Sequence, residues 1–246
     1  MADRVAVVTG ASSGIGQATA KALAREGYAV ALAARREDRI GELAEEISSD
    51  SGRAIAVPTD VADQASAAAL IQTTKHEFGS VDVLVNNAGV MLLGPILGAD
   101  VEEWQRMVHV NLLGLMYCTH AALPIMQEQG GGHIVNVSSV AGRVSRLGGG
   151  VYSATKWGVG AFSEALRQEA LNYNVRVTIV EPGFVDTELQ GHNENPMVVD
   201  AIEKNRDEIG KVLEAGDIAN AIVYAVQQPD HVSLNEVLVR PTRQRG

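Results

Sequence analysis

Short, nearly continuous apolar runs alternate along the chain with longer segments in which apolar residues recur at helical spacing. Strands are predicted at Val5–Thr9, Ala29–Ala34, Ala54–Pro58, Val83–Asn86, His133–Val137, Val175–Val180 and Glu236–Val239. Helices are predicted near Gly14–Glu26, Arg36–Ser49, Gln64–Phe78, Val101–Gln127, Ser153–Tyr173 and Asp217–Gln227. Strands that are apolar throughout belong to sheets covered on both faces, which is typical of parallel sheets. The pattern therefore predicts one α/β domain over residues 1–246, with about seven parallel strands between two layers of helices.

The alternation stops at residues 184–210, which form a long polar stretch. Long irregular segments inside a compact domain are usually functional. We expect this segment to be a substrate lid, in which Leu189, His192 and Met197 could line a pocket.

Charge and composition exclude several classes of partner. The chain has 20 Lys and Arg against 30 Asp and Glu, a formal net charge of −10, which disfavours nucleic acid and anionic membranes. No apolar run is expected to reach the roughly 20 residues that span a bilayer, because His120 and Pro124 interrupt the longest candidate. Cys118 is the only cysteine, and no signal-peptide pattern precedes Val5. We expect a cytoplasmic protein that binds neither nucleic acid nor membrane.

A glycine-rich turn, Thr9-Gly10-Ala11-Ser12-Ser13-Gly14-Ile15-Gly16, follows the first predicted strand and opens the first predicted helix. Glycines in this setting let backbone N–H groups approach a pyrophosphate at the helix N-terminus. Glycines also commonly end strands, so the interpretation that this is only a turn stays open.

Arg35 and Arg36 follow the second predicted strand, where dinucleotide-binding folds place an acidic residue if they recognise a ribose 2′-hydroxyl. A guanidinium there can instead bind a 2′-phosphate through charge-assisted hydrogen bonds. The pair favours NADP over NAD, although both arginines could also be the solvated start of a charged helix.

Tyr152 and Lys156 lie four residues apart on one predicted helix, which places them on the same face. A free phenol has a pKa of about 10, and a nearby cation is expected to lower it toward useful acid–base chemistry. On spacing alone, an ordinary surface pair is the alternative.

These segments together resemble the short-chain dehydrogenase/reductase family along essentially the whole chain. The resemblance rests on Thr9-Gly10-x-x-x-Gly14-Ile15-Gly16, Asp60-Val61, Asn86-Asn87-Ala88-Gly89, Asn111, Ser139, Tyr152-x-x-x-Lys156 and Pro182-Gly183, in the family's order and approximate spacing. It implies a doubly wound Rossmann fold. It also implies an NADP(H)-dependent oxidoreductase that interconverts a ketone or aldehyde and the corresponding alcohol.

The resemblance assigns catalytic roles by position. Tyr152 would be the general acid/base, Lys156 would lower its pKa and bind the nicotinamide ribose, and Ser139 would hold the substrate oxygen. Asn111 would hold a water that links Lys156 to solvent. The spacing of the family's serine from its tyrosine selects Ser139 over its neighbour Ser138.

The resemblance also assigns binding residues. Those expected to bind NADP are Gly10, Ser12, Ser13, Gly14, Ile15, Gly16, Arg35, Arg36, Asp60, Val61, Asn87, Ala88, Gly89, Tyr152, Lys156, Pro182, Gly183, Val185 and Thr187. Those expected to bind the substrate, a small carbonyl compound or alcohol, are Ser139, Tyr152 and Leu189.

Finer features of the resemblance concern substrate and assembly. Met91–Pro95, Asn111–Tyr117 and Asp186–Leu189 are similar to segments of the bacterial NADP-dependent carbonyl reductases related to clavulanic acid dehydrogenase. Family analogy implies a homo-oligomer, a tetramer or a dimer, with the tail after Val239 reaching a neighbouring subunit. Trp104 and Trp157 would then serve core or interface packing.

Other functions remain open. A catalytically silent protein that senses NADP(H) could use the same fold. A dehydratase or epimerase is a further alternative, although such enzymes usually carry an added substrate domain. No metal is expected, because His109 and His120 have no Cys, Asp or Glu cluster at ligand spacing.

Overall fold

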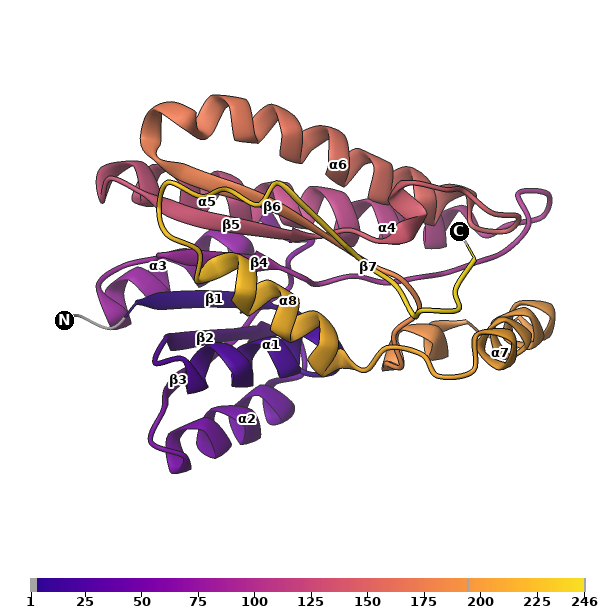
Figure 1. The fold of residues 1–246 in the computed structure, drawn as a ribbon, viewed down its shortest axis with the longest axis horizontal. Coiled ribbons are helices and arrows are strands. Elements are labelled where there is room, and N and C mark those ends of the chain that lie inside the picture. The colour runs from indigo at the N-terminus through magenta and orange to yellow at the C-terminus, as the bar shows by residue number, and fades with distance from the viewer. Residues whose placement is uncertain (1–3, 194, 246) are drawn as a thin grey trace.

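A parallel sheet of seven strands runs through the protein, in the order β3-β2-β1-β4-β5-β6-β7 (Figure 1). The computed structural model describes residues 4–193 and 195–245. The strands are β1 Val5–Thr9, β2 Ala29–Ala34, β3 Arg53–Pro58, β4 Val83–Asn86, β5 Gly132–Val137, β6 Val175–Pro182 and β7 Glu236–Val239. The order reverses between β1 and β4, and in open α/β sheets ligands bind at the carboxyl ends of strands beside such a reversal.

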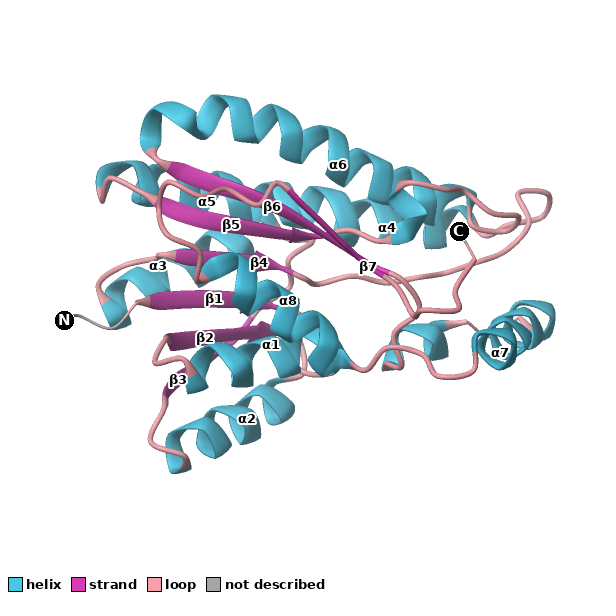
Figure 2. Cartoon of the chain, in the orientation of Figure 1, coloured by secondary structure: helices cyan, strands magenta, loops and turns pink. Residues whose placement is uncertain are grey.

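Helices cover both faces of the sheet (Figure 2). They are α1 Gly14–Arg25, α2 Glu37–Ser49, α3 Gln64–Phe78, α4 Val101–Val108, α5 Gly114–Glu128, α6 Gly150–Ala170, α7 Pro196–Ile209 and α8 Ala215–Val226. One buried cluster joins α1, α2 and α8 to one face of the sheet, and a second joins α3, α5 and α6 to the other. The predicted doubly wound α/β fold is therefore confirmed.

Residues 184–210 differ from the expected irregular stretch. They contain a short 3₁₀ turn, η4 (Glu188–His192), and the helix α7, which lies away from the sheet (Figure 1). Only Ile209 of α7 is buried, although Val198, Ile202 and Ile209 recur at helical spacing along one face of the helix. Its start was nevertheless encoded, because Asn195 caps the helix and Pro196 stands in its first turn. Glu194, within the expected lid, lies outside the described residues.

The predicted helix Val101–Gln127 is continuous but contains a π-helical turn, η1 (His109–Leu113), between α4 and α5. By length and composition alone, Val101–Glu128 could cross a membrane, so the expectation that no segment reaches that length is too strict. Cys118, Ala122 and Met126 are fully buried within the second core cluster. Packing inside the protein thus accounts for part of the apolar character of this helix, since 39% of its most apolar window is buried.

Candidate functional site

A cleft of about 310 Å³ lies at the carboxyl ends of the strands, beside the reversal in strand order. The expected residues that line it are Gly10, Ser12, Ser13, Gly14, Ile15, Arg35, Arg36, Asp60, Val61, Asn87, Ala88, Gly89, Ser139, Tyr152, Lys156, Pro182, Gly183, Val185, Thr187 and Leu189. Two expected residues, Gly16 and Asn111, do not line it. The sequence motifs, although far apart in the chain, therefore converge on one cavity.

The glycine-rich turn packs closely against its neighbours, and only glycine fits there because it has no Cβ. Gly10 and Gly14 have φ values of 66° and 54°, in the left-handed region. A Cβ on Gly10 would lie 2.9 Å from the Cα of Ala88. Gly16 is pressed against the Gly10 carbonyl, so it acts by packing helix against turn rather than by facing the cleft.

The N-terminus of α1 opens into this cleft. Ser13 is its N-cap residue, and the Ser13 side chain makes no capping hydrogen bond. The first N–H groups of the helix and its positive dipole end suit a pyrophosphate. The backbone space and the donors of this turn therefore fit a dinucleotide.

Asn87 and Thr9 hold the turn to the end of β4. The Asn87 side-chain amide donates to the Thr9 carbonyl over 2.9 Å, and the Thr9 hydroxyl accepts from the Asn87 backbone N–H over 3.0 Å. Asn87 thus positions the glycine-rich turn, a role that its place in the motif did not reveal.

Arg36 is the better placed of the two arginines. Its guanidinium donates to the hydroxyls of Ser12 and Ser13, the latter over 2.7 Å, and forms an ion pair with Glu188 over 2.7 Å. Arg35 lines the same part of the cleft and is exposed. A guanidinium fixed beside serine hydroxyls suits a ribose 2′-phosphate.

Tyr152, Lys156 and Ser139 meet at the other end of the cleft. Ser139 caps a 3₁₀ turn, η2 (Val140–Gly142), just after β5, while the other two lie on α6. Tyr152 and Lys156 are 7% and 5% exposed, so both are buried. The Lys156 ammonium donates to the Val137 carbonyl over 3.0 Å and lies 5.8 Å from the centre of the Tyr152 ring.

The pKa of the Tyr152 phenol differs from the sequence expectation. Burial raises it to about 12, and a hydrogen bond with Ser139 offsets only part of that rise. Burial also lowers the pKa of the Lys156 ammonium to about 8. Desolvation is the largest cause of both shifts, because a low-dielectric site disfavours the charged form of each group.

Ser138 and Asn111 have structural contacts of their own. The Ser138 hydroxyl donates to the Lys156 carbonyl over 3.0 Å, so Ser139 is the serine beside the phenol. The Asn111 side chain exchanges hydrogen bonds with backbone groups of Val90 and donates to the Thr155 hydroxyl over 3.2 Å. Asn111 therefore fixes the loop after β4 to α6, and its expected water relay stays a prediction.

The chain's own C-terminal tail supports the loop that follows β6. The Phe184 backbone N–H donates to the Gln244 side chain over 2.8 Å, and Pro241 packs closely on Gly183. The tail thus contacts its own chain, which is a different contact from the expected reach toward a neighbouring subunit.

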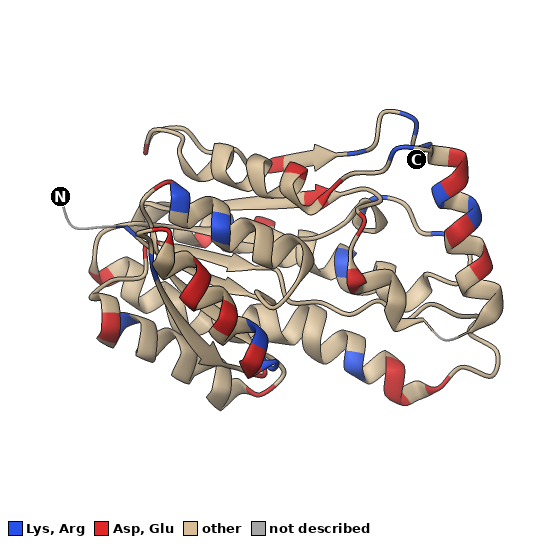
Figure 3. Ribbon diagram, turned by 90° about the horizontal axis from the view of Figure 1, so that it is seen from below, with Lys and Arg blue, Asp and Glu red and all other residues tan. Residues whose placement is uncertain are grey.

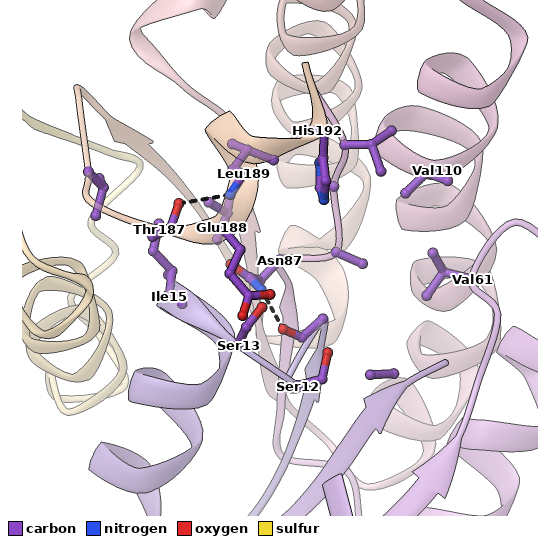
Figure 4. A pocket seen from close by; sticks show the side chains of 18 of the residues that line it. Ser12, Ser13, Ile15, Val61, Asn87, Val110, Thr187, Glu188, Leu189 and His192 are labelled. Atoms are coloured by element: carbon purple, nitrogen blue, oxygen red, sulfur yellow. Dashed lines mark hydrogen bonds between the residues drawn. The ribbon is translucent and has the colours of Figure 1, made fainter. Parts of the chain in front are cut away.

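Of the expected lid residues, Leu189 and His192 line the cleft, whereas Met197 is 71% exposed and does not (Figure 4). His192 also borders a second cavity of about 250 Å³ with a mixed lining, in which Leu92 and Trp104 are apolar and Asp100 and Glu103 are acidic. Partial burial lowers the pKa of the His192 imidazole.

Glu188 and Arg39 also belong to this site, although the sequence did not indicate them. The Glu188 carboxylate binds Arg36 and Arg39 over 2.7 Å each, and it lines the cleft beside Ser13 (Figure 4). Its place directly after Thr187 was the available signal. Among residues 4–193 and 195–245, no three metal-ligating side chains gather.

The chain matches a known protein family and is similar to known proteins in sequence. The family described as short chain dehydrogenase matches residues 4–197. Glycine betaine reductase of Emericella nidulans is 43% identical over 242 residues, which are 98% of this chain but 19% of that longer protein. An uncharacterized oxidoreductase of Staphylococcus saprophyticus is 42% identical over 241 residues, 97% of each chain.

Solved structures share the fold over nearly the full length. The closed form of a serine dehydrogenase complexed with NADP⁺ has a TM-score of 0.89 and 34% identity, covering 98% of this chain and 96% of that one. An alcohol dehydrogenase from the archaeon Thermococcus sibiricus, complexed with 5-hydroxy-NADP, has a TM-score of 0.87 and 32% identity. That match covers 99% of this chain and 98% of the other.

Proposed function

Because this chain belongs to the short-chain dehydrogenase family, we propose that it is an NADP(H)-dependent oxidoreductase that interconverts a ketone or aldehyde and the corresponding alcohol. One observation carries the proposal. A single cleft joins the glycine-rich turn and Arg36 at one end to the buried Tyr152 and Lys156 at the other. A dinucleotide bound along this cleft would bring its reactive ring to the buried pair.

NADP(H) would supply or accept the hydride. During reduction, Tyr152 would donate its proton to the carbonyl oxygen, and its raised pKa keeps the phenol in the donating form at neutral pH. Lys156, protonated below about pH 8, would stabilise the phenolate that remains. Ser139, beside the phenol, would hold the substrate oxygen.

NADP is proposed over NAD on local chemistry. Arg36 sits between the hydroxyls of Ser12 and Ser13, where guanidinium and hydroxyl donors could all reach a 2′-phosphate. The two structural relatives named above contain NADP or a derivative, which supports the same choice.

The substrate is proposed as a small alcohol or carbonyl compound. Three relatives are named as a serine dehydrogenase, an alcohol dehydrogenase and a glycine betaine reductase. These names agree with a small substrate that bears one reactive alcohol or carbonyl group. The expected likeness to bacterial carbonyl reductases related to clavulanic acid dehydrogenase also indicates a substrate of this class. Apolar Leu92 and Trp104 in the second cavity would receive the rest of the molecule.

We also propose a cytoplasmic homo-oligomer, a dimer or tetramer. Cys118 is buried and free, which suits a reducing compartment. Trp157 on α6 is 54% exposed, and Val101 on α4 is 53% exposed, so these helices offer apolar surface to a second copy. Light scattering coupled to size exclusion would give the mass, and a monomer at micromolar concentration would contradict the assembly.

The activity is tested by following NADPH consumption with a panel of small ketones and aldehydes, and NADP⁺ reduction with the matching alcohols. Turnover by the protein, lost in Tyr152→Phe, is the expected result. NADPH binding without turnover on any compound would favour the sensing protein instead. Equal activity with NADH and NADPH would contradict the cofactor choice.

A further inference from the structure

Glu188 connects two parts of the cleft that are far apart in sequence. It begins η4, in the segment after β6, while Arg36 and Arg39 lie at the start of α2. One carboxylate oxygen contacts Arg36 and the other contacts Arg39, each over 2.7 Å. The pair of guanidiniums lowers the pKa of Glu188 to about 2, so the carboxylate is charged at neutral pH.

The contacts of Arg36 leave little room for a further anion. Its Nε and Nη2 donate to the Ser12 hydroxyl, Nη2 also donates to Ser13, and Nη1 donates to Glu188. Each nitrogen of this guanidinium is therefore engaged with the protein. Four of the five N–H groups of the guanidinium are used in this way, and the fifth is the second N–H of Nη1. A phosphate bound by Arg36 would therefore use Nη1, which already donates to an anion, or take over one of the serine contacts.

The two kinds of partner would respond differently to a phosphate. The hydroxyls of Ser12 and Ser13 can turn and donate to phosphate oxygens, so both can stay beside it. The Glu188 carboxylate carries only acceptors, and its negative charge repels a phosphate. It is also half exposed and keeps Arg39 as a second partner, so it can leave Arg36 without becoming an unpaired buried charge.

We propose that Glu188 is a specificity-determining residue that competes with the 2′-phosphate of NADP(H) for Arg36. The carboxylate weakens binding of the phosphorylated cofactor and leaves binding of NADH almost unchanged, because NADH places no phosphate there. Binding of a 2′-phosphate also moves the start of η4, which couples the adenosine end of the cleft to the segment that carries Leu189 and His192. This inference rests on the proposed use of NADP(H).

The test is direct binding, measured by calorimetry or NADPH fluorescence, at low salt where exposed charges are least screened. Glu188→Gln keeps the size of the side chain and removes its charge. An exposed ion pair of this kind predicts that NADPH binds about twofold to fivefold more tightly to the variant, with NADH unchanged. Adenosine 2′-monophosphate should follow NADPH, and adenosine 5′-monophosphate should follow NADH.

Glu46→Gln is the matched control. Glu46 lies on α2, the helix that carries Arg39, and pairs with Lys21. Glu46→Gln therefore makes the same change in net charge without removing a partner of Arg36 or Arg39. Equal tightening in both variants, equal shifts for NADPH and NADH, or weaker NADPH binding to Glu188→Gln would overturn the inference alone. Failure of the unaltered protein to bind NADPH would overturn both this inference and the proposed function.

Discussion

The two ends of the cleft control their charged groups by different physical means. At the catalytic end, Tyr152 and Lys156 are buried, and desolvation moves both pKa values toward the neutral forms. At the adenosine end, the side chains of Arg36 and Glu188 are 42% and 52% exposed and hold each other by pairing. The first end should be sensitive to pH and insensitive to salt, and the second should behave in the opposite way.

The largest expected effect is at the buried end. Tyr152→Phe removes the proton donor while keeping the ring, so carbonyl reduction should fall by about a thousandfold. NADPH affinity should change little, because the proposed phosphate contacts lie at the other end of the cleft. Steady-state rates and a binding titration on the same preparation check this, and residual activity above a tenth of the starting value would contradict the role of Tyr152.

An ion pair with one buried partner should give the next effect. Arg143 binds the buried Glu181 through two hydrogen bonds of 2.7 and 2.8 Å, and it also pairs with Glu236. Arg143→Ala leaves the Glu181 carboxylate buried without that partner, which should lower the free energy of unfolding by about 2 to 3 kcal/mol. Urea denaturation measures the change.

Arg167→Ala provides the control for that variant. Arg167 pairs with Glu164 at an exposed position of α6. Arg167→Ala should barely change the urea concentration at the midpoint of unfolding. Equal shifts in the two variants would remove the distinction between buried and exposed pairs.

At the exposed end, Arg36→Ala should weaken NADPH binding by about tenfold, since it removes charge-assisted hydrogen bonds to a phosphate. NADH binding should stay almost constant. Rising salt should weaken NADPH binding to the unaltered protein and much less to the variant. If Arg35→Ala instead gives the larger loss, the 2′-phosphate lies on the other arginine.

The smallest effect is a pH dependence of the reduction rate. The pKa of Lys156 is about 8, so the ammonium is charged below that pH and neutral above it. The rate should therefore fall as pH rises, reaching about half of its plateau near pH 8. In Lys156→Arg the guanidinium stays protonated, and this decline should move to much higher pH. A rate that rises through pH 8 would contradict the assignment.

The sequence predicted best what depends on local pattern. Apolar runs such as Val5–Thr9 and Ala29–Ala34 match the observed strands, and Asp63 caps α3 as its position indicates. The convergence of the motifs on one cleft was expected from the resemblance, and the lining residues agree with it. The strands and the helix cap follow from local composition and spacing, whereas the convergence of the motifs followed from the family resemblance.

What the sequence did not predict depends on tertiary contacts. Helix α7 was not predicted although Val198, Ile202 and Ile209 recur at helical spacing, because these few apolar residues stand among many polar ones. The contact between Arg36 and Glu188 joins residues 152 positions apart. The direction in which the pKa of Tyr152 shifts depends on how deeply the phenol is buried. The spacing of Tyr152 from Lys156 does not reveal that burial.

The π-helical turn at His109–Leu113 sets the register of a long helix. Before it, α4 directs Met107 into the apolar cluster that contains Tyr152, and after it α5 directs Cys118 into the core beneath the sheet. Each residue of an α-helix turns the chain by about 100°. Loss of one residue from α4 or α5 would therefore rotate one of these faces away from its partner. Loss of one residue from the π-helical turn should instead shorten it to an ordinary α-helical turn and leave both faces in place. In evolution, this helix should accept many changes of side chain, and a change of length only within the π-helical turn.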